Sequence, residues 1–370
     1  MDRFPAAARA WMMPLLLSML GACTQPGEKP PEALQPLSWS VEQPGPYRVG
    51  FMSWELSYTP AGSSQSRIIP LSIWYPTEDL SGAATTYEFV FNDEDSWQNA
   101  TAAPAAHADG YPVLVYSHGN QGFAGSSAFL MRSFASHGWV ALAPDHIGNT
   151  LTTHSSPRPL ALWLNRSLDL SAALDELSGR APELLGEAVD SSQVLVTGHS
   201  FGAHTTWASS GGLFDRQRIE DRCEAGEFPA EQCTGELLDA FEAGGRDPRF
   251  IAGAPLAGKG SEEWFGSNGL NAVSLPMLQM SGSADAGAVE GVWDRSEQVD
   301  LTWIDIEGGC HQLFALGACD QVPSEEGFHI VSTYALAFAR HQVLGDHSTE
   351  VLSLLDGSRL LSPRVSLQRR

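Results

Sequence analysis

Continuous apolar runs alternate with segments of helical spacing along most of the chain, and this alternation constrains the possible folds more than any other feature. Residues 111–116, 139–143 and 194–197 are apolar almost throughout, as expected of strands that are buried on both faces. Residues 126–137 and 160–177 instead carry apolar side chains at helical spacing. Strands that alternate with helices predict a mostly parallel central sheet with helices on both faces.

Two further runs precede this part of the chain. Residues 48–58 and 68–75 are strand-like and flank a short polar stretch. This pattern predicts a hairpin whose strands join the sheet in antiparallel orientation. Residues 77–110 are polar and aromatic without a clear period, and we predict a loop there.

A single domain over residues 47–345 accounts for the pattern, because a chain of this length can bury one large core. Residues 211–249 are acidic and rich in Gly, and we predict that they form an insertion that caps a site. Residues 346–370 are predicted to be a C-terminal tail. The remaining elements expected in the domain are strands at residues 250–254, 277–281 and 301–306 and a closing helix at residues 329–343.

The first residues are typical of an export signal. Arg3 and Arg9 accompany a short apolar run at residues 11–20. A helix that spans a bilayer needs about 20 residues, so this run is too short to do so. We therefore predict a signal peptide over residues 1–22.

The run Leu-Gly-Ala-Cys at residues 20–23 resembles a bacterial lipobox, in which the cysteine becomes the lipidated first residue of the mature protein. We expect Cys23 to carry this anchor on a flexible tether over residues 23–46, which are rich in Pro, Gly, Gln and Glu. Thr24 stands after the cysteine instead of Asp, which favours an exported protein held at the outer membrane. The alternative is a plain signal peptide followed by an incidental cysteine.

The charge of the chain argues against one class of partner. Its formal net charge is −23, from 44 acidic and 21 basic residues, and the sequence holds no basic cluster. Such a chain repels phosphate backbones, so we expect no nucleic-acid partner.

Four cysteines follow the candidate anchor, and an even number in an exported chain predicts two disulfides. The simplest pairing is local, although the sequence allows three connectivities. A zinc site is the alternative, but the sequence holds no C-x-x-C pair, so we expect no metal. The four residues are Cys223, Cys233, Cys310 and Cys319.

The run Gly-His-Ser-Phe-Gly at residues 198–202 fits the pattern G-x-S-x-G. It follows the predicted strand at 194–197 and opens a helix-like segment at 203–210, which is the setting that a nucleophile elbow requires. In such a turn small flanking residues avoid a collision with neighbouring backbone, and the serine hydroxyl stands at the edge of the sheet. We therefore predict that Ser200 is a nucleophile; the alternative is an ordinary strand–helix turn.

A serine nucleophile needs a base, usually a histidine that a carboxylate orients. With this elbow the order along the chain is Ser, acid, His. His311 lies in the loop after the predicted strand at 301–306, and we expect it to be the base. Asp285 follows the strand at 277–281 and is the best candidate for the acid. The competing carboxylates are Glu290, Asp294 and Asp305.

The oxyanion formed by nucleophilic attack needs fixed N–H donors. We expect one to be the backbone N–H of Phe201, directly after the nucleophile. The other should come from the Gly-rich loop after the strand at 111–116, where Asn120 is the first choice and Gln121 the second. His146 also follows a strand but precedes the nucleophile, so we expect it to hold loops by hydrogen bonding; a metal site is the alternative.

These motifs together resemble those of bacterial hydrolases known as predicted dienelactone hydrolases, which are similar to platelet-activating-factor acetylhydrolases and, more loosely, to cutinases. The resemblance covers roughly residues 46–342. It implies an α/β-hydrolase fold and a Ser-Asp-His esterase that acts on an acyl ester without a cofactor. The runs that carry it are His118-Gly119 and residues 135–141, 143–150, 198–202 and 309–312.

Two departures from these families matter. True dienelactone hydrolases use a cysteine nucleophile, so Ser200 argues against their reaction. In the acetylhydrolases the acid follows an earlier strand, where this chain has Ala-Pro-Leu-Ala at residues 254–257. Asp285 is then left as the acid, at the position that cutinases and lipases use.

The function that we predict from the sequence is carboxylic-ester hydrolysis through an acyl-enzyme on Ser200, with a small-molecule or lipid ester as substrate and no metal or organic cofactor. The lipid anchor would keep the enzyme at a membrane surface. An amidase, a thioesterase or a polyester hydrolase of the same fold is an alternative. A catalytically inactive binding lipoprotein is another.

Overall fold

The computed structural model describes residues 35–88 and 91–370. The predicted signal peptide at residues 1–22, Cys23 and the first part of the tether lie outside the described residues. Within the described part of the chain, no helix has the length and apolar character needed to cross a membrane.

An 11-stranded sheet runs through the described domain in the order β11-β10-β9-β8-β7-β5-β6-β2-β1-β4-β3. Its central strands are parallel, as predicted from their continuous apolar sequences. These strands are β5 (Tyr111–Ser117), β6 (Val140–Pro144), β7 (Val189–His199), β8 (Phe250–Leu256), β9 (Met277–Gly282) and β10 (Leu301–Ile306). The predicted N-terminal hairpin is also present, as β1 (Arg48–Tyr58) and β2 (Arg67–Thr77), and joins β6 in antiparallel orientation.

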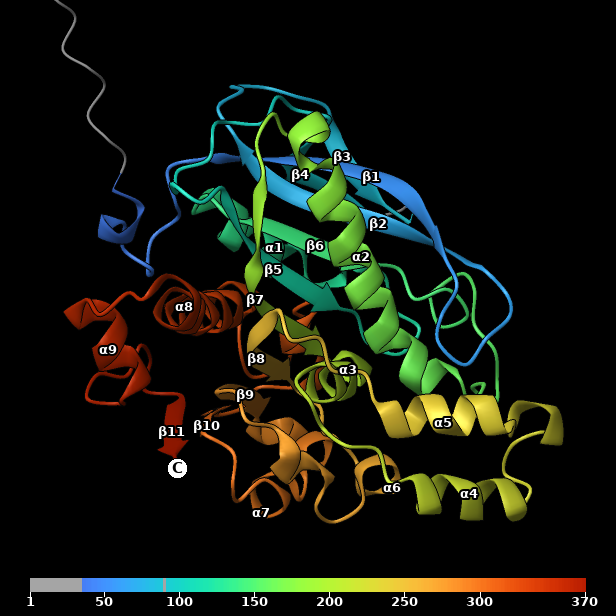
Figure 1. Ribbon diagram of the computed structural model, residues 1–370. Coiled ribbons are helices and arrows are strands. Elements are labelled where there is room, and N and C mark those ends of the chain that lie inside the picture. Colours follow the sequence, from blue (N-terminus) through green and yellow to red (C-terminus); the bar gives the residue numbers. More distant parts are fainter. Residues whose placement is uncertain (1–34, 89–90) are drawn as a thin grey trace, which may run out of the picture. The chain divides into compact units, whose positions relative to one another are not determined.

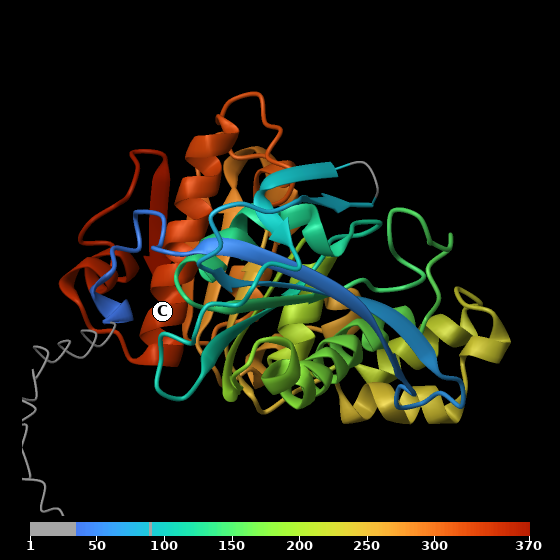
Figure 2. The same ribbon diagram turned by 90° about the horizontal axis from the view of Figure 1, so that it is seen from above.

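Helices cover both faces of this sheet (Figures 1 and 2). Helices α1 (Ala128–Ser136) and α8 (Ser324–Leu344) pack on one face, and α2 (Leu162–Leu184) and α3 (Phe201–Ser209) pack on the other. Each face has its own apolar core, because both surfaces of the parallel strands are buried. The short α6 (Glu262–Phe265) and α7 (Val292–Arg295) precede and follow β9.

Short 3₁₀ helices complete several of the connections between strands and helices. They span Pro36–Ser38, Ala124–Ser127, Ala230–Gln232, Gly269–Ala272, Ser283–Val289 and His311–Phe314.

The prediction of a loop over residues 77–110 was wrong. This segment contains β3 (Ala84–Tyr87) and β4 (Phe91–Gln98), which pair with each other, and β4 extends the sheet beyond β1. Its inward-facing positions are partly polar: the buried Asp93 carboxylate accepts hydrogen bonds from the Tyr87 and Ser96 hydroxyls. Because polar side chains occupy buried positions, the strands lack the apolar alternation that sequence analysis detects.

Both ends of the described chain pack against the domain. Residues 346–370, predicted as a tail, form α9 (Thr349–Leu355) and β11 (Val365–Arg369), and β11 pairs with the edge of β10. At the other end, part of the predicted tether lies against α8, where the buried Arg340 guanidinium donates to the carbonyls of Leu37 and Trp39. These contacts complete the hydrogen bonding of a buried cation, and its aspartate partner Asp346 also comes from the C-terminal segment.

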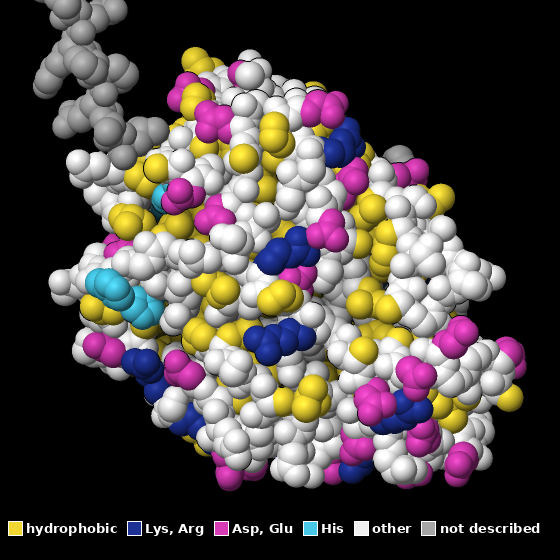
Figure 3. Space-filling model, in the orientation of Figure 1, with side chains coloured by type: hydrophobic (Ala, Val, Ile, Leu, Met, Phe, Trp, Pro, Cys, Tyr) yellow, Lys and Arg dark blue, Asp and Glu magenta, His cyan; other side chains and the backbone are white. Residues whose placement is uncertain are grey.

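The acidic insertion at residues 211–249 folds as α4 (Arg216–Glu224) and α5 (Gly235–Ala243), and its disulfide joins Cys223 to Cys233. Its apolar side chains belong to a core that includes Trp207 and Trp264. On its outer surface acidic side chains gather around a basic one (Figure 3), and Arg216 there pairs with Glu220, Asp239 and Glu242. Its role as a cap stays a prediction.

The second disulfide joins Cys310 to Cys319. The local pairing that we considered simplest is therefore confirmed for both pairs.

Helix α9 provides a direct test of whether the C-terminal segment stabilises the domain. Leu354 is fully buried there, whereas Leu352 on the same helix is 37% exposed. We expect Leu354→Ala to lower the free energy of unfolding by about 2–5 kcal/mol and Leu352→Ala to change it by about 0.5 kcal/mol or less. Urea unfolding of both variants measures the difference; equal and small effects would show that the segment behaves as a tail.

Candidate active site

Ser200 stands in a sharp turn between β7 and α3. Its backbone has φ +58° and ψ −112°, a strained conformation for a residue with a side chain. The turn closes only because Gly198 and Gly202 have no side chains: a Cβ at either position would overlap backbone atoms, among them the Ser117 carbonyl oxygen. The Ser200 N–H donates to the Leu256 carbonyl at 2.9 Å, which ties the turn to β8. The predicted strand–turn–helix setting of the serine is therefore present.

A continuous chain of hydrogen bonds leads away from the serine hydroxyl. His311 Nε2 lies 2.8 Å from Ser200 Oγ, and His311 Nδ1 lies 2.5 Å from Asp285 Oδ2. An ionised carboxylate can only accept, so Nδ1 carries the ring proton and Nε2 is free to accept the hydroxyl proton. The structure thus brings together the three residues that the sequence singled out, in the order Ser, acid, His along the chain.

The competing carboxylates lie elsewhere. Asp305 Oδ1 accepts a hydrogen bond from the Ser281 hydroxyl at 2.7 Å. Asp294 lies on α7, and Glu290 ends the 3₁₀ helix that contains Asp285. Asp285 is therefore the carboxylate that bonds His311.

Two features that sequence reasoning did not use hold the His311 loop. The disulfide between Cys310 and Cys319 closes the loop that contains His311, and Cys310 directly precedes the histidine. The ring of His199, the residue before Ser200, donates from Nε2 to the His311 carbonyl at 3.0 Å. The residue at the second, variable position of the G-x-S-x-G pattern, His199, therefore contacts the backbone of His311.

The Gly-rich loop after β5 lies directly against the nucleophile. A Cβ built on Gly119 would be 3.3 Å from the Ser200 Cβ, so the next residue, Asn120, is close to the serine. Phe201 is the first residue of α3, and the first N–H groups of a helix have no acceptor inside it. These positions fit the two predicted oxyanion donors. The second choice for the loop donor, Gln121, has a positive φ of +54°.

His146 lies behind this loop in a buried hydrogen-bond network. Its Nδ1 bonds Asp169 at 2.9 Å, and its backbone N–H donates to His118 Nε2 at 3.0 Å. Burial lowers the pKa of His146, so its ring stays neutral. The carboxyl pKa of Asp169 is lowered, because hydrogen bonding from His146 and the charge of Arg67 outweigh the opposite effect of burial. These contacts fit the predicted role of His146 in holding loops.

Among the described residues, no group of three or more His, Cys, Asp or Glu side chains is arranged to hold a metal ion. Two of the hydrogen-bonded side chains are partly accessible from solvent: that of His311 is 34% exposed and that of Asp285 is 21% exposed.

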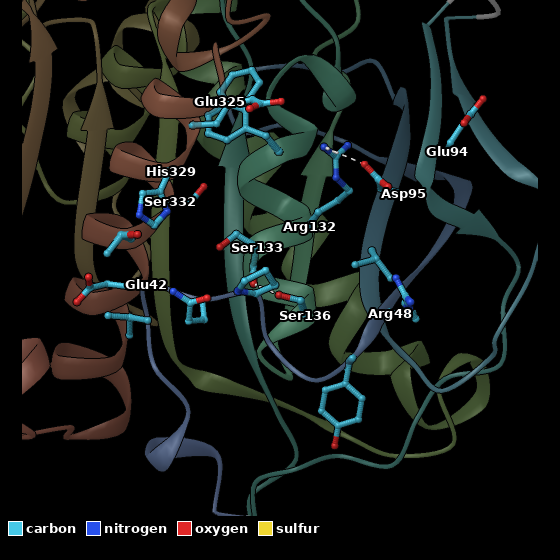
Figure 4. A pocket seen from close by; sticks show the side chains of 18 of the residues that line it. Glu42, Arg48, Glu94, Asp95, Arg132, Ser133, Ser136, Glu325, His329 and Ser332 are labelled. Atoms are coloured by element: carbon cyan, nitrogen blue, oxygen red, sulfur yellow. Dashed lines mark hydrogen bonds and ion pairs between the residues drawn. The ribbon is translucent and has the colours of Figure 1, made fainter. Parts of the chain in front are cut away.

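A cavity of about 520 Å³ lies on another part of the domain, between α1, α8 and the segment at residues 41–49 (Figure 4). Its lining does not include Ser200, Asp285 or His311. One of its charged groups, Arg132, already pairs with Asp93 and Asp95. This cavity is therefore separate from the hydrogen-bonded group of Ser200, His311 and Asp285.

Two buried histidines near the nucleophile stay neutral in the folded protein. His204 on α3 lies among the rings of Trp163 and Trp264, and burial lowers its pKa to about 3. Burial and the neighbouring His311 lower the pKa of His199 to about 3 as well. In the unfolded chain both side chains have a pKa of about 6.5.

We therefore expect the free energy of unfolding to fall as the pH is lowered from about 6.5 toward 3. In this window the unfolded histidines bind protons that the folded ones do not, at a cost of about 1.4 kcal/mol per pH unit for each group. Asp145 opposes this trend, because burial raises its pKa to about 7 and the folded state then holds the extra proton as the pH falls.

Urea unfolding at pH 7 and pH 5 measures this dependence. The variant His204→Phe, which removes one of these buried neutral histidines, should lose less stability on acidification than the wild type by about 1.4 kcal/mol per pH unit. A slope identical to that of the wild type would show that His204 is not a neutral buried group.

No family model matches the chain. Two curated proteins are similar to part of it: Cutinase 1 of Thermobifida cellulosilytica and the cutinase of Thermobifida fusca strain YX, each 34% identical over 96 residues. The matched segment is 26% of this chain and spans only 33% and 29% of the two cutinases. The resemblance to predicted dienelactone hydrolases and acetylhydrolases stays a prediction.

One solved structure that is similar over nearly the whole chain is a ferulic acid esterase from Streptomyces cinnamoneus. It superposes with a TM-score of 0.63 at 19% identity, and the match covers 90% of this chain and 99% of that one. At this identity the likeness concerns the fold. Together with the mixed sheet and the helices on both faces, it shows that the chain has the α/β-hydrolase fold.

Proposed function

We propose that the protein is a serine carboxylic-ester hydrolase that acts through Ser200, His311 and Asp285. The observation that carries this proposal is the unbroken hydrogen-bond chain from the serine hydroxyl to the carboxylate, built on a strained turn between β7 and α3. The likeness of part of the chain to two cutinases, and of its fold to a ferulic acid esterase, supports ester hydrolysis.

In the first step Ser200 Oγ attacks the ester carbonyl carbon while His311 Nε2 takes the hydroxyl proton. Asp285 stabilises the imidazolium that forms. The N–H groups of Phe201 and Asn120 hold the negative oxygen of the tetrahedral intermediate. Collapse breaks the bond to the alcohol oxygen, which leaves with the proton from His311, and the acyl group remains on Ser200.

In the second step a water molecule attacks the acyl-enzyme. His311 takes one proton from this water, and a second tetrahedral intermediate forms, whose negative oxygen is held by the same two N–H groups. When it collapses, Ser200 Oγ regains a proton from His311 and the carboxylic acid is released. No step of this sequence requires a metal or an organic cofactor.

The exposure of the triad bears on the substrate. Because His311 and Asp285 are partly accessible, a substrate can approach them from solvent. The two disulfides are compatible with an oxidising compartment outside the cytoplasm. Export, with a lipid anchor on Cys23, is part of the same proposal and is supported by the sequence.

The nucleophile is tested with a fluorophosphonate, which reacts with activated serines. We expect the wild type to be labelled and to hydrolyse p-nitrophenyl esters, and we expect Ser200→Ala to lose both properties. Ser210→Ala is the matched control, since Ser210 is buried at the end of the same helix and should leave labelling unchanged. Labelling that persists in Ser200→Ala would overturn the assignment.

The same assay distinguishes the alternatives. A series of p-nitrophenyl esters from acetate to palmitate gives the preferred acyl length, and matched anilides and thioesters detect amidase or thioesterase activity. Folded wild-type protein that is neither labelled nor active would favour a binding lipoprotein.

The assignment of the acid is tested separately. Asp285→Asn should lower kcat by about a thousandfold or more, because the amide cannot stabilise the imidazolium and favours the wrong ring tautomer. Asp305→Asn is the control, since that carboxylate bonds Ser281 and not the base. Steady-state kinetics of the two variants measure the effect; comparable losses in both would remove Asp285 from its assigned role.

A further inference from the structure

Arg166 lies near the N-terminal end of α2 and is fully buried, although the mechanism above assigns it no role. Its guanidinium makes four hydrogen bonds to acceptors on three different parts of the chain. The acceptors are the Ser117 hydroxyl, the His118 carbonyl, the Asn149 side-chain oxygen and the Thr205 hydroxyl.

On one side these contacts fix the oxyanion loop. Arg166 Nη2 donates to the His118 carbonyl, two residues before Asn120. Arg166 Nη1 donates to Asn149 Oδ1 at 2.9 Å, and Asn149 Nδ2 donates in turn to Asn120 Oδ1 at 2.8 Å. The guanidinium therefore reaches the loop donor by two routes, through backbone and through the Asn149 side chain.

On the other side the same group holds the start of α3. Arg166 Nε donates to Thr205 Oγ1 at 3.1 Å, and that hydroxyl donates to the Phe201 carbonyl at 3.2 Å. The guanidinium carbon also lies 4.4 Å from the centre of the Phe201 ring, within range of a cation–π interaction.

We propose that Arg166 is a positioning residue that fixes the two oxyanion donors, Asn120 and Phe201, at a set distance from each other and from Ser200 Oγ. The inference rests on the proposed function, since it assigns a role in the same reaction. A planar guanidinium suits this role because its donors point in fixed directions and can reach several acceptors at once.

The charge of Arg166 has a second consequence. None of its four hydrogen-bond acceptors is a carboxylate, and the nearby Asp169 is already bonded to Arg67 and His146. Burial lowers the pKa of Arg166 to about 9, so it remains a cation at neutral pH. A buried cation beside the donors favours the negative charge that develops on the substrate oxygen in the transition state.

A group that acts on the transition state should affect kcat and leave KM nearly unchanged. We expect Arg166→Met, which keeps an unbranched side chain but removes the guanidinium, to lower kcat on p-nitrophenyl butyrate on the order of a hundredfold, as for loss of one oxyanion donor. Arg166→Lys keeps the charge but not the fork of donors, and its kcat should fall between those of Arg166→Met and the wild type.

The affinity for butylboronic acid provides a second measurement. It should not change if Arg166 only stabilises the fold. This compound forms a tetrahedral adduct with an active-site serine and imitates the transition state. Its inhibition constant should rise in parallel with the loss of kcat/KM in each variant, whereas KM for the ester stays within about threefold.

Asn149→Ala serves as the second variant, because it breaks the link to Asn120 without removing the buried cation. If Arg166→Met does not fold, this variant tests the positioning role instead. We expect its kcat to fall about tenfold with KM unchanged. Arg340→Met is the matched control for loss of a buried guanidinium: Arg340 is 2% exposed and bonds Asp346 and the N-terminal segment. It should lower the melting temperature and leave kcat unchanged.

The outcomes are distinct. Folded Arg166→Met with kcat within about threefold of the wild type, or Asn149→Ala with unchanged kcat and unchanged boronate affinity, would overturn the inference and leave the esterase proposal intact. If the Ser200→Ala variant hydrolyses the ester at the rate of the wild type, the proposed function itself fails.

Discussion

The close packing of the serine turn against the end of β5 is the constraint on which the site depends. The turn can approach the Ser117 carbonyl only where Gly198 and Gly202 have no Cβ. This approach places the Gly119 loop beside Ser200 and brings the start of α3 against the same strand end. The parallel strands carry the loops after their C-terminal ends at one edge of the sheet, and the loops after β9 and β10 bring Asp285 and His311 to the serine there.

Buried polar groups around this turn are joined into networks instead of being excluded. On one side the His199 ring bonds the carbonyl of His311. On the other, Arg166 connects the oxyanion loop to α3. In an interior of low polarity each such group needs a partner, so the network can adopt few arrangements and holds its members rigidly. The His311 side chain is more exposed, at 34%, so a rigid buried layer supports a proposed catalytic group that is open to solvent.

The sequence was informative where one physical signal dominated. The continuous apolar runs predicted the parallel strands, and the strand at 301–306 agrees residue for residue with β10. The G-x-S-x-G pattern led to Ser200, and chain order led to Asp285 and His311. The loop predicted over residues 77–110 failed because the buried face of its hairpin holds Asp93, so the apolar period is missing. Arg166 gave no signal either, since an arginine on a helix is usually exposed.

The sequence by itself determined the layered α/β architecture and the residue types of the candidate site, because apolar periodicity and the glycines of a tight turn are local properties of the chain. Only the tertiary structure decided which carboxylate bonds His311, which cysteines pair, and that the final residues add β11 to the sheet. It also decided that Arg166, 34 positions before Ser200 in the sequence, packs on the Phe201 ring and bonds Asn149, which in turn bonds Asn120. These are contacts between segments far apart in the chain, and they depend on how strands and helices pack together, which no local pattern of residues records.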